Sequence, residues 1–381
     1  MTTLARMSPT NDPARSTVTG PELRVESGVC HVLFVYDVGF AVNLDEAERH
    51  IQAAKHRESI RRTRKAPRYF QYRPPPLRVT IAAESVSIAG FASEPSVDFV
   101  IYDFGAATVL YRIPLAGPLQ EIQRLALDLY DNELLLIDSK QRVEQLLHAI
   151  GPVVAKSNLA DVIEDYVILQ ITASAPPIDT QRAISDYGLP LAQLLRAEPE
   201  VLSAQEIEDS LACRIAFGTR DVIFVDWNAS LLIGADMDDV LAVLEFANVE
   251  LLEMRFLDDQ LDLALGEAYG QFSHRKWRTW PFRSRAAVLE RVARLQLDSA
   301  ILFEGVNNTL KLLGDPYLAR VYRLAAQRLH LSDWDTSILR KLKTVESIYE
   351  KISDQQSTLR MEVLEWIIIL LIAISIVVSL K

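Results

Sequence analysis

The chain has 381 residues, of which 49% are hydrophobic and 24% are charged, and its formal net charge is −11. This length suggests two or three domains with a substantial core. The negative charge argues against a protein that mainly coats nucleic acid, and two cysteines are too few for a disulfide framework or a cysteine-rich zinc site.

The chain is expected to begin with a disordered leader over residues 1–22, which are polar and include Pro and Thr. This stretch has no apolar core, so it does not resemble a secretory signal peptide. The strand patterns that follow predict an α+β head, divided near residue 175 into a first part (23–175) and a second part (176–237) by the linker SAPPID.

One pattern recurs three times in the head: an apolar run, a turn with Asp, a second apolar run and then a helix. It covers residues 29–44, 97–113 and 220–234, with Asp37, Asp103 and Asp226 at the turns. Each unit predicts a β-hairpin, and aspartate suits such turns because its carboxylate accepts hydrogen bonds from nearby backbone N–H groups. Further strands are predicted at 77–90, 131–137 and 165–174, and helices at 45–62 and 141–155. The expected head is therefore hairpin-rich with a mainly antiparallel sheet.

Signals of catalysis are weak. The chain has no Gly-rich phosphate loop, no His-Glu-x-x-His and no nucleophile elbow, and its six histidines are scattered without ligand spacing. His31 lies within an apolar strand pattern and is interpreted as a core or edge residue. No catalytic, cofactor-binding or metal-binding residue is predicted, no cofactor is expected, and the protein is expected not to be an enzyme.

From residue 238 to 365 the pattern is helical and predicts a bundle that ends in a coiled coil. Asp315 is expected to cap a helix with Pro316 in its first turn. A four–three spacing of side chains then forms a seam that must find a partner within the chain or in another copy, so a homo-oligomer is expected. The seam residues are Ile338, Leu342, Val345, Tyr349, Ile352, Gln356, Leu359 and Val363.

Residues 366–380 contain no charged residue, Pro or Gly, and they predict one C-terminal transmembrane helix. A very apolar core or subunit-contact helix is the alternative, but such helices usually keep one polar side. Because basic residues lie mainly before this stretch, the positive-inside rule predicts a single-pass tail anchor in a bacterial inner (cytoplasmic) membrane, with the bulk of the chain in the cytoplasm.

Four stretches resemble the family named "required for meiotic nuclear division", also called YagE-like. They are residues 31–48, 244–262, 311–329 and the terminal 364–377. The resemblance implies a membrane-anchored, self-associating protein, and the family includes a mitochondrial inner-membrane protein that supports translation. It implies no catalytic residues. The chain lacks the Arg-rich leader of an organelle protein, which favours a bacterial membrane.

Two basic segments stand out on this acidic chain. The segment 55–73 mixes cations and aromatic rings that suit stacking on RNA, although an exposed loop is the more common meaning of such a run; the possible RNA contacts are Arg61, Arg62, Arg64, Lys65, Tyr69 and Tyr72. The segment 274–285 suits a membrane headgroup region. Its predicted membrane contacts, together with one tail residue, are Trp277, Arg278, Trp280, Phe282, Arg283 and Trp366.

The predicted long helix from Asp238 carries polar residues at three- and four-residue steps: Glu245, Asn248, Arg255, Asp259 and Asp262. A solvated face is the preferred interpretation, with Arg255 paired to Asp258 or Asp259. The leading functional hypothesis is a tail-anchored, non-enzymatic membrane scaffold whose head binds a protein partner. The second is an RNA- or ribosome-associated membrane tether, and an enzyme of unknown class is the third.

Overall fold

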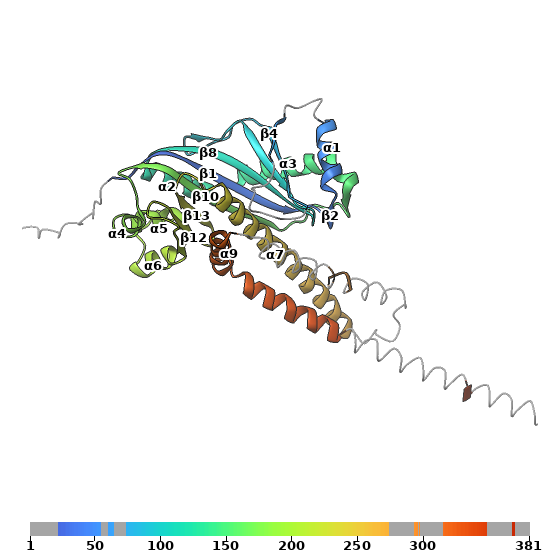
Figure 1. The fold of residues 1–381 in the computed structure, drawn as a ribbon. Helices are drawn as coiled ribbons and strands as arrows, with labels where there is room; N and C mark the ends of the chain where they lie inside the picture. The colour runs from blue at the N-terminus through green and yellow to red at the C-terminus, as the bar shows by residue number, and fades with distance from the viewer. Residues whose placement is uncertain are drawn as a thin grey trace, which may run out of the picture.

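The computed structural model describes residues 22–54, 60–64, 74–273, 293–295, 297, 315–348 and 368–369, with only the backbone of 52–54, 60–64 and 267–273. A nine-stranded mixed sheet forms the middle layer, and helices cover both of its faces (Figure 1). The expected leader lies outside the described residues except for Glu22.

The sheet has the order β11-β12-β13-β10-β1-β8-β7-β4-β3, and all neighbours are antiparallel except β10 and β13. In that order the strands are Arg214–Ile215, Val222–Val225, Ala229–Ile233, Ile163–Ala175, Arg24–Asp37, Ala106–Pro118, Ser96–Ile101, Leu77–Ala82 and Ile60–Arg64. Two small sheets pair β2 (Ala41–Val42) with β9 (Val154–Ala155) and β5 (Ser87–Ile88) with β6 (Phe91–Ala92). One sheet thus crosses the boundary placed near residue 175.

Strand β1 is apolar on both faces because both are covered by helices. Val32 and Phe34 enter one core, and Leu33 and Val35 enter the other. The first core is closed by six helices and a short 3-10 turn, which are α1 (Leu44–Ala54), α2 (Leu119–Leu129), α3 (Glu133–Ile150), η1 (Gly151–Val153), α4 (Thr180–Ser185), α5 (Gly188–Arg196) and α6 (Ala204–Ala212).

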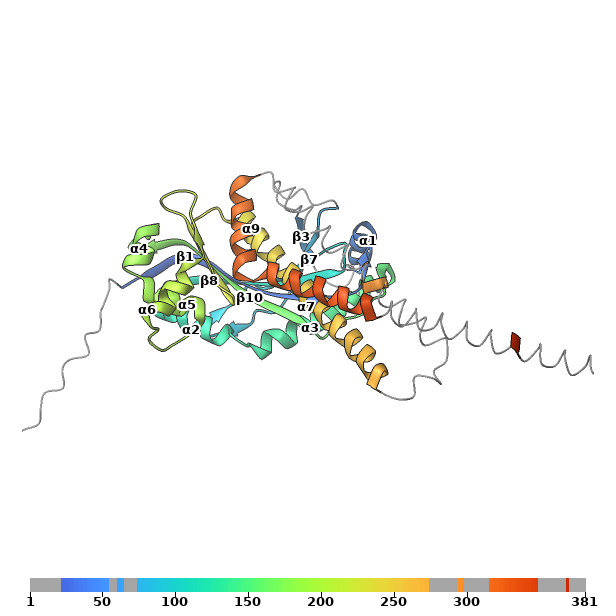
Figure 2. The ribbon, with the colours of Figure 1, turned by 90° about the horizontal axis from the view of Figure 1, so that it is seen from below.

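The second core lies under α7 (Asp238–Ser273), α9 (Pro316–Arg328) and a helix over 331–348. The helix 331–348 runs beside α7 in Figure 1 and crosses it in the view of Figure 2, and Lys341 joins the two helices through Asp258 at 2.8 Å and Asp262 at 2.6 Å. Asp315 caps α9 by accepting a hydrogen bond from the Tyr317 backbone N–H, as the sequence predicts.

Two of the three predicted hairpins are confirmed, namely β7–β8 and β12–β13. The first predicted hairpin, over residues 29–44, is wrong. Strands β8 and β10 pair with the two edges of β1, and the second apolar run forms β2, which pairs with β9. At Gly39 the chain instead bends and packs against the turn between β7 and β8. A Cβ atom on Gly105, which has a φ of 102°, would lie 1.7 Å from the Gly39 carbonyl oxygen.

Two local predictions are also wrong. Of residues 131–137, which the sequence predicts as a strand, 133–137 begin helix α3, because the Asn132 side chain accepts a hydrogen bond from the Leu135 N–H and caps the helix. The helix predicted over 45–62 ends at Ala54, and Ile60–Arg64 form the edge strand β3 instead, because they pair with β4.

The predicted transmembrane helix over 366–380 requires the largest correction. Within the ranges that the structure describes, no helix has both the length and the apolar content to cross a bilayer. The long helix α7, for example, carries Asp and Glu in several of its turns. Of the predicted span itself, only residues 368 and 369 are described. For the described part of the chain this finding overturns the predicted transmembrane helix, tail anchor and single-pass inner-membrane localisation, and the rest of 366–380 lies outside that part.

Candidate functional site

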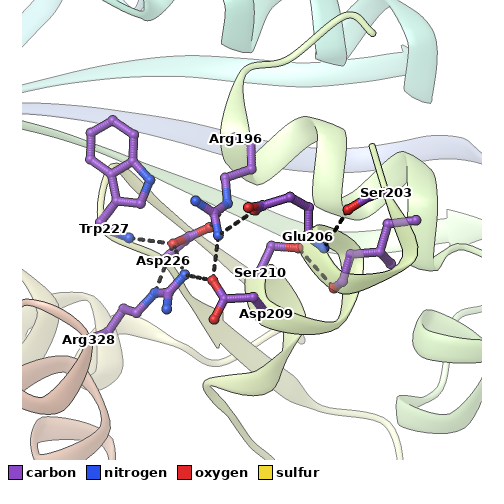
Figure 3. A network of polar contacts seen from close by, with 9 residues as sticks. Arg196, Ser203, Glu206, Asp209, Ser210, Asp226, Trp227 and Arg328 are labelled. Atoms are coloured by element: carbon purple, nitrogen blue, oxygen red, sulfur yellow. Dashed lines mark hydrogen bonds and ion pairs between the residues drawn. The ribbon is translucent and has the colours of Figure 1, made fainter. Parts of the chain in front are cut away.

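A buried carboxylate organises the β12–β13 turn. Asp226 is fully buried there between Arg196 at the end of α5 and Arg328 at the end of α9. One Asp226 oxygen lies 2.7 Å from Arg196 Nε, and the other lies 2.6 Å from Arg328 Nη2 and 2.9 Å from its Nε (Figure 3). A buried charge needs such partners, because an isolated one would be strongly destabilising.

Helix α6 completes this network with two further carboxylates. Asp209 lies 2.7 Å from Arg196 Nη2 and 2.8 Å from Arg328 Nη2, and Glu206 lies 3.3 Å from Arg196. The hydrogen bond from Arg328, aided by the charges of both arginines, lowers the pKa of Asp209. The two guanidinium groups therefore fasten the turn to α5, α6 and α9, three helices from different parts of the chain.

The same network fixes the position of Trp227. The Trp227 backbone N–H donates to Asp226 Oδ1 at 2.7 Å, and the buried Tyr166 hydroxyl donates to the Asp226 carbonyl at 2.8 Å. Figure 3 shows the indole turned away from the ion pairs. Its ring is half exposed and meets Tyr130 edge-on, with the centroids 6.3 Å apart. The turn therefore presents a large aromatic ring from a rigid base.

Other large apolar side chains are exposed where α2 passes into α3. Leu127 and Tyr130 end the first helix, and Leu134 and Ile137 begin the second. With Trp227 they form what we call the α2–α3 surface, and each of the five is between 40% and 68% exposed. Because α3 turns other residues into the core, these side chains have no core to enter. Grouped exposed apolar residues of this size mark interaction sites.

Three acidic side chains lie beside the α2–α3 surface. Asp128, Asp131 and Glu133 are all exposed around the same turn. Burial, together with the neighbouring charge of Asp131, raises the pKa of Asp165, and a backbone hydrogen bond and then the charge of Arg255 offset this only in part. A cationic group placed here would therefore be favoured electrostatically.

The arrangement combines ion-paired carboxylates with an exposed aromatic ring. In the part of the chain that the structure describes, no group of three or more His, Cys, Asp or Glu side chains could hold a metal ion. The carboxylates of the network are already ion-paired with arginines. What the site offers is a rigid aromatic ring beside leucine and isoleucine side chains with a negative rim, a combination that fits an apolar segment carrying positive charge.

The predicted site residues fall in three places. Ile338, Leu342 and Val345 are buried in the chain's own second core with α7, so the cis alternative holds for this part of the seam. Arg61, Arg62 and Arg64 lie on the edge strand β3. The others lie outside the described residues: Tyr349, Ile352, Gln356, Leu359, Val363, Lys65, Tyr69, Tyr72, Trp277, Arg278, Trp280, Phe282, Arg283 and Trp366.

The predicted solvated face of α7 is wrong at its start, where Glu245 and Asn248 are buried, whereas Asp259 and Asp262 are exposed. Arg255 pairs with Glu164 of β10, not with its helical neighbours. The sequence predicts the turn at Asp226–Asn228 but not the ion pairs of Asp226. The two arginines that pair with Asp226 lie 30 residues before it and 102 residues after it.

By its fold, this chain is a mixed-sheet protein with helices on both faces of the sheet. It exposes a group of apolar side chains beside acidic ones. It belongs to the family described as uncharacterized protein MJ0711, N-terminal domain, whose model matches residues 27–239. It is also similar to the uncharacterized protein MJ0711 of Methanocaldococcus jannaschii, with 21% identity over 274 residues, 68% of this chain and 83% of that protein. No solved structure matches. The resemblance to the meiotic nuclear division family stays a prediction.

Proposed function

We propose that the protein is a non-enzymatic scaffold, and that its α2–α3 surface binds a basic, apolar segment of a partner protein. The observation that carries this proposal is the exposed group of Leu127, Tyr130, Leu134, Ile137 and Trp227 within a rim of carboxylates. Burying one such side chain fully contributes about 1.5–3 kcal/mol. Trp and Tyr are also the residues that most often dominate the energy of an interface.

The rigidity of the site supports the same proposal. The backbone of Trp227 is held through Asp226, and Asp226 is held by arginines from two helices. A partner therefore meets a ring that is already in place, which reduces the entropy lost on binding. The acidic rim contributes mainly to the rate and selectivity of association, so binding should weaken as salt is added.

A synthetic peptide tests the proposal. The chain's own sequence 274–285 is basic and aromatic and serves as the probe, labelled for fluorescence anisotropy. We expect saturable binding, and we expect Trp227→Ala and Leu134→Ala each to raise the Kd by about 10-fold or more. Phe217→Ala is the matched control, because this ring is 76% exposed at a different place in the chain. Equal affinities of the wild type and the two surface variants would reject the proposal.

Self-association is a separate part of the proposed scaffold role. Because Ile338, Leu342 and Val345 are buried within their own chain, contacts between copies have to use other residues. Light scattering on the full chain at several concentrations measures its mass. A mass that stays at 42.9 kDa throughout would remove the homo-oligomer from the proposal.

RNA binding is the second candidate function, and one observation favours it. Arg61, Arg62 and Arg64 stand together on β3, an edge strand of the large sheet. Clustered arginines bind phosphates and stack on bases. Crosslinking followed by recovery of the protein distinguishes this function: RNA must be recovered with the wild type and lost when all three arginines are replaced by glutamine. Equal recovery from both proteins would reject it.

A further inference from the structure

A cavity of about 400 Å³ lies between the large sheet and the beginning of α7. Five adjacent strands, β10, β1, β8, β7 and β4, contribute polar side chains to its wall. These side chains replace the apolar ones that form the rest of the core under α7. These side chains are Gln170, His31, Arg112, Asp98, Thr80 and Arg78. Its volume falls in the range of about 300–1,000 Å³ that is usual for small-molecule sites.

His31 is the most informative residue in this wall. It is only 6% exposed, and within the described part of the chain neither ring nitrogen makes a hydrogen bond of normal geometry. The buried Nε of Arg78 likewise has no hydrogen-bond partner of normal geometry among the described residues. Buried polar atoms are almost always hydrogen-bonded, so these three atoms indicate that something else binds there.

The imidazole is neutral at physiological pH. Burial, and then the nearby charge of Arg112, lowers the pKa of His31 to about 4, against smaller opposing effects of a side-chain interaction with Gln170, which lies outside normal hydrogen-bond geometry, and of the charge of Asp98. A neutral ring offers one donor and one acceptor. With the Nε–H of Arg78, the buried wall therefore provides two donors and one acceptor.

Positive charge lies on the sheet side of the cavity. Arg78 pairs with the buried Glu245 at 2.9 Å, and Arg112 pairs with Asp98 and lies 3.8 Å from Glu94. Each guanidinium has five N–H donors in a planar fork, more than its carboxylate partner can accept. These two arginines can therefore each bind a second, carboxylate-like group.

Negative charge lies on the helix side. Asp238 and Asp239 stand in the first turn of α7 and line the cavity. Burial, followed by the charges of Asp236, Asp238 and Asp315, raises the pKa of Asp239. A ligand cation would relieve this repulsion, whereas a simple anion would increase it.

We propose that this cavity binds a small zwitterion of the α-amino-acid type. Its carboxylate lies toward Arg78, Arg112 and His31, and its ammonium group lies toward Asp238 and Asp239. Both charges are then paired, and the N–H groups of His31 and Arg78 gain an acceptor. The cavity lies on the α7 face of the sheet, whereas α2 and α3 cover the other face, so this proposal does not depend on the proposed partner binding.

The test uses the full chain and the twenty standard L-amino acids. Each is added at about 10 mM and the change in Tm is measured, since a ligand that binds the folded state raises it. Calorimetry then gives the Kd of each amino acid that raises Tm. His31→Leu removes the imidazole and with it only a side-chain contact with Gln170, and the Tm of the free variant shows whether the fold is retained. Asp239→Asn tests the ammonium side, and His148→Leu, an exposed position on α3, is the control.

We expect at least one amino acid to raise Tm, and both cavity variants to weaken its binding by about 10-fold or more. His148→Leu should bind as the wild type does. Acetate and methylammonium, which carry one charge each, should bind far more weakly than the amino acid. The proposal is overturned if no amino acid raises Tm, if His31→Leu binds like the wild type, or if one single-charge probe binds as tightly.

Discussion

Replacing Glu250 by glutamine should make the protein more stable at high pH. Glu250 lies on α7, is 3% exposed and accepts a hydrogen bond from the Tyr322 hydroxyl of α9. Burial raises its pKa from 4.5 to about 7, the hydrogen bond from Tyr322 opposes this, and the charge of Asp335 adds to it. Glutamine resembles the protonated acid, so the variant keeps the neutral form at every pH.

The sign and size follow from the raised pKa. The folded protein holds the proton of Glu250 more tightly than the unfolded chain does. The stabilising contribution of this group is therefore complete below pH 4.5 and is lost as the pH rises through 7. A carboxyl pKa that rises from 4.5 to about 7 corresponds to about 3 kcal/mol. Between about pH 4 and about pH 8, Glu250→Gln should therefore gain about 3 kcal/mol relative to the wild type.

Urea unfolding of both proteins at the two pH values measures this difference. Glu144→Gln, an exposed position on α3, controls for the loss of a carboxylate as such and should track the wild type. The reasoning is refuted if the difference in unfolding free energy between Glu250→Gln and the wild type is the same at both pH values.

Three further changes test the packing. Asp226→Asn leaves two arginines without their buried counter-charge and should cost about 3 kcal/mol in urea unfolding; no loss would contradict the network. Gly105→Ala forces a methyl group against the Gly39 carbonyl and should lower Tm far more than Gly90→Ala, which meets no atom within 4 Å; equal losses would contradict the close turn. Ile338→Ala should cost about 2–5 kcal/mol at every protein concentration, and a cost that changes with concentration would place this residue between copies.

The parts of the fold that depend on neighbouring residues could be predicted from the sequence. The β7–β8 and β12–β13 turns carry residues suited to tight turns, and Asp315 followed by Pro316 starts a helix. The apolar run at 131–137 failed because short apolar runs fit a strand or a helix equally well, and the cap at Asn132 decides between them.

The parts that depend on distant residues could not be predicted. Strand β1 pairs with β8 and β10, not with the run that follows it, and no local pattern specifies that choice. Glu245 lies on a helix face that the sequence predicts to be solvated. In the structure it pairs with Arg78, which lies 167 residues earlier in the chain. The apolar strand pattern predicts His31 to be a core or edge residue; it is buried, but only the fold reveals the cavity that it lines.

The central claim is that carboxylates beside exposed apolar side chains select a basic partner, and a charge exchange tests it most directly. Asp131→Lys combined with Glu133→Lys reverses the rim, and a second peptide replaces each Lys and Arg of 274–285 by Glu. We predict that the wild type binds only the basic peptide and that the reversed variant binds the acidic one better, by about 10-fold or more in Kd. Equal binding of both peptides to both proteins would contradict the claim.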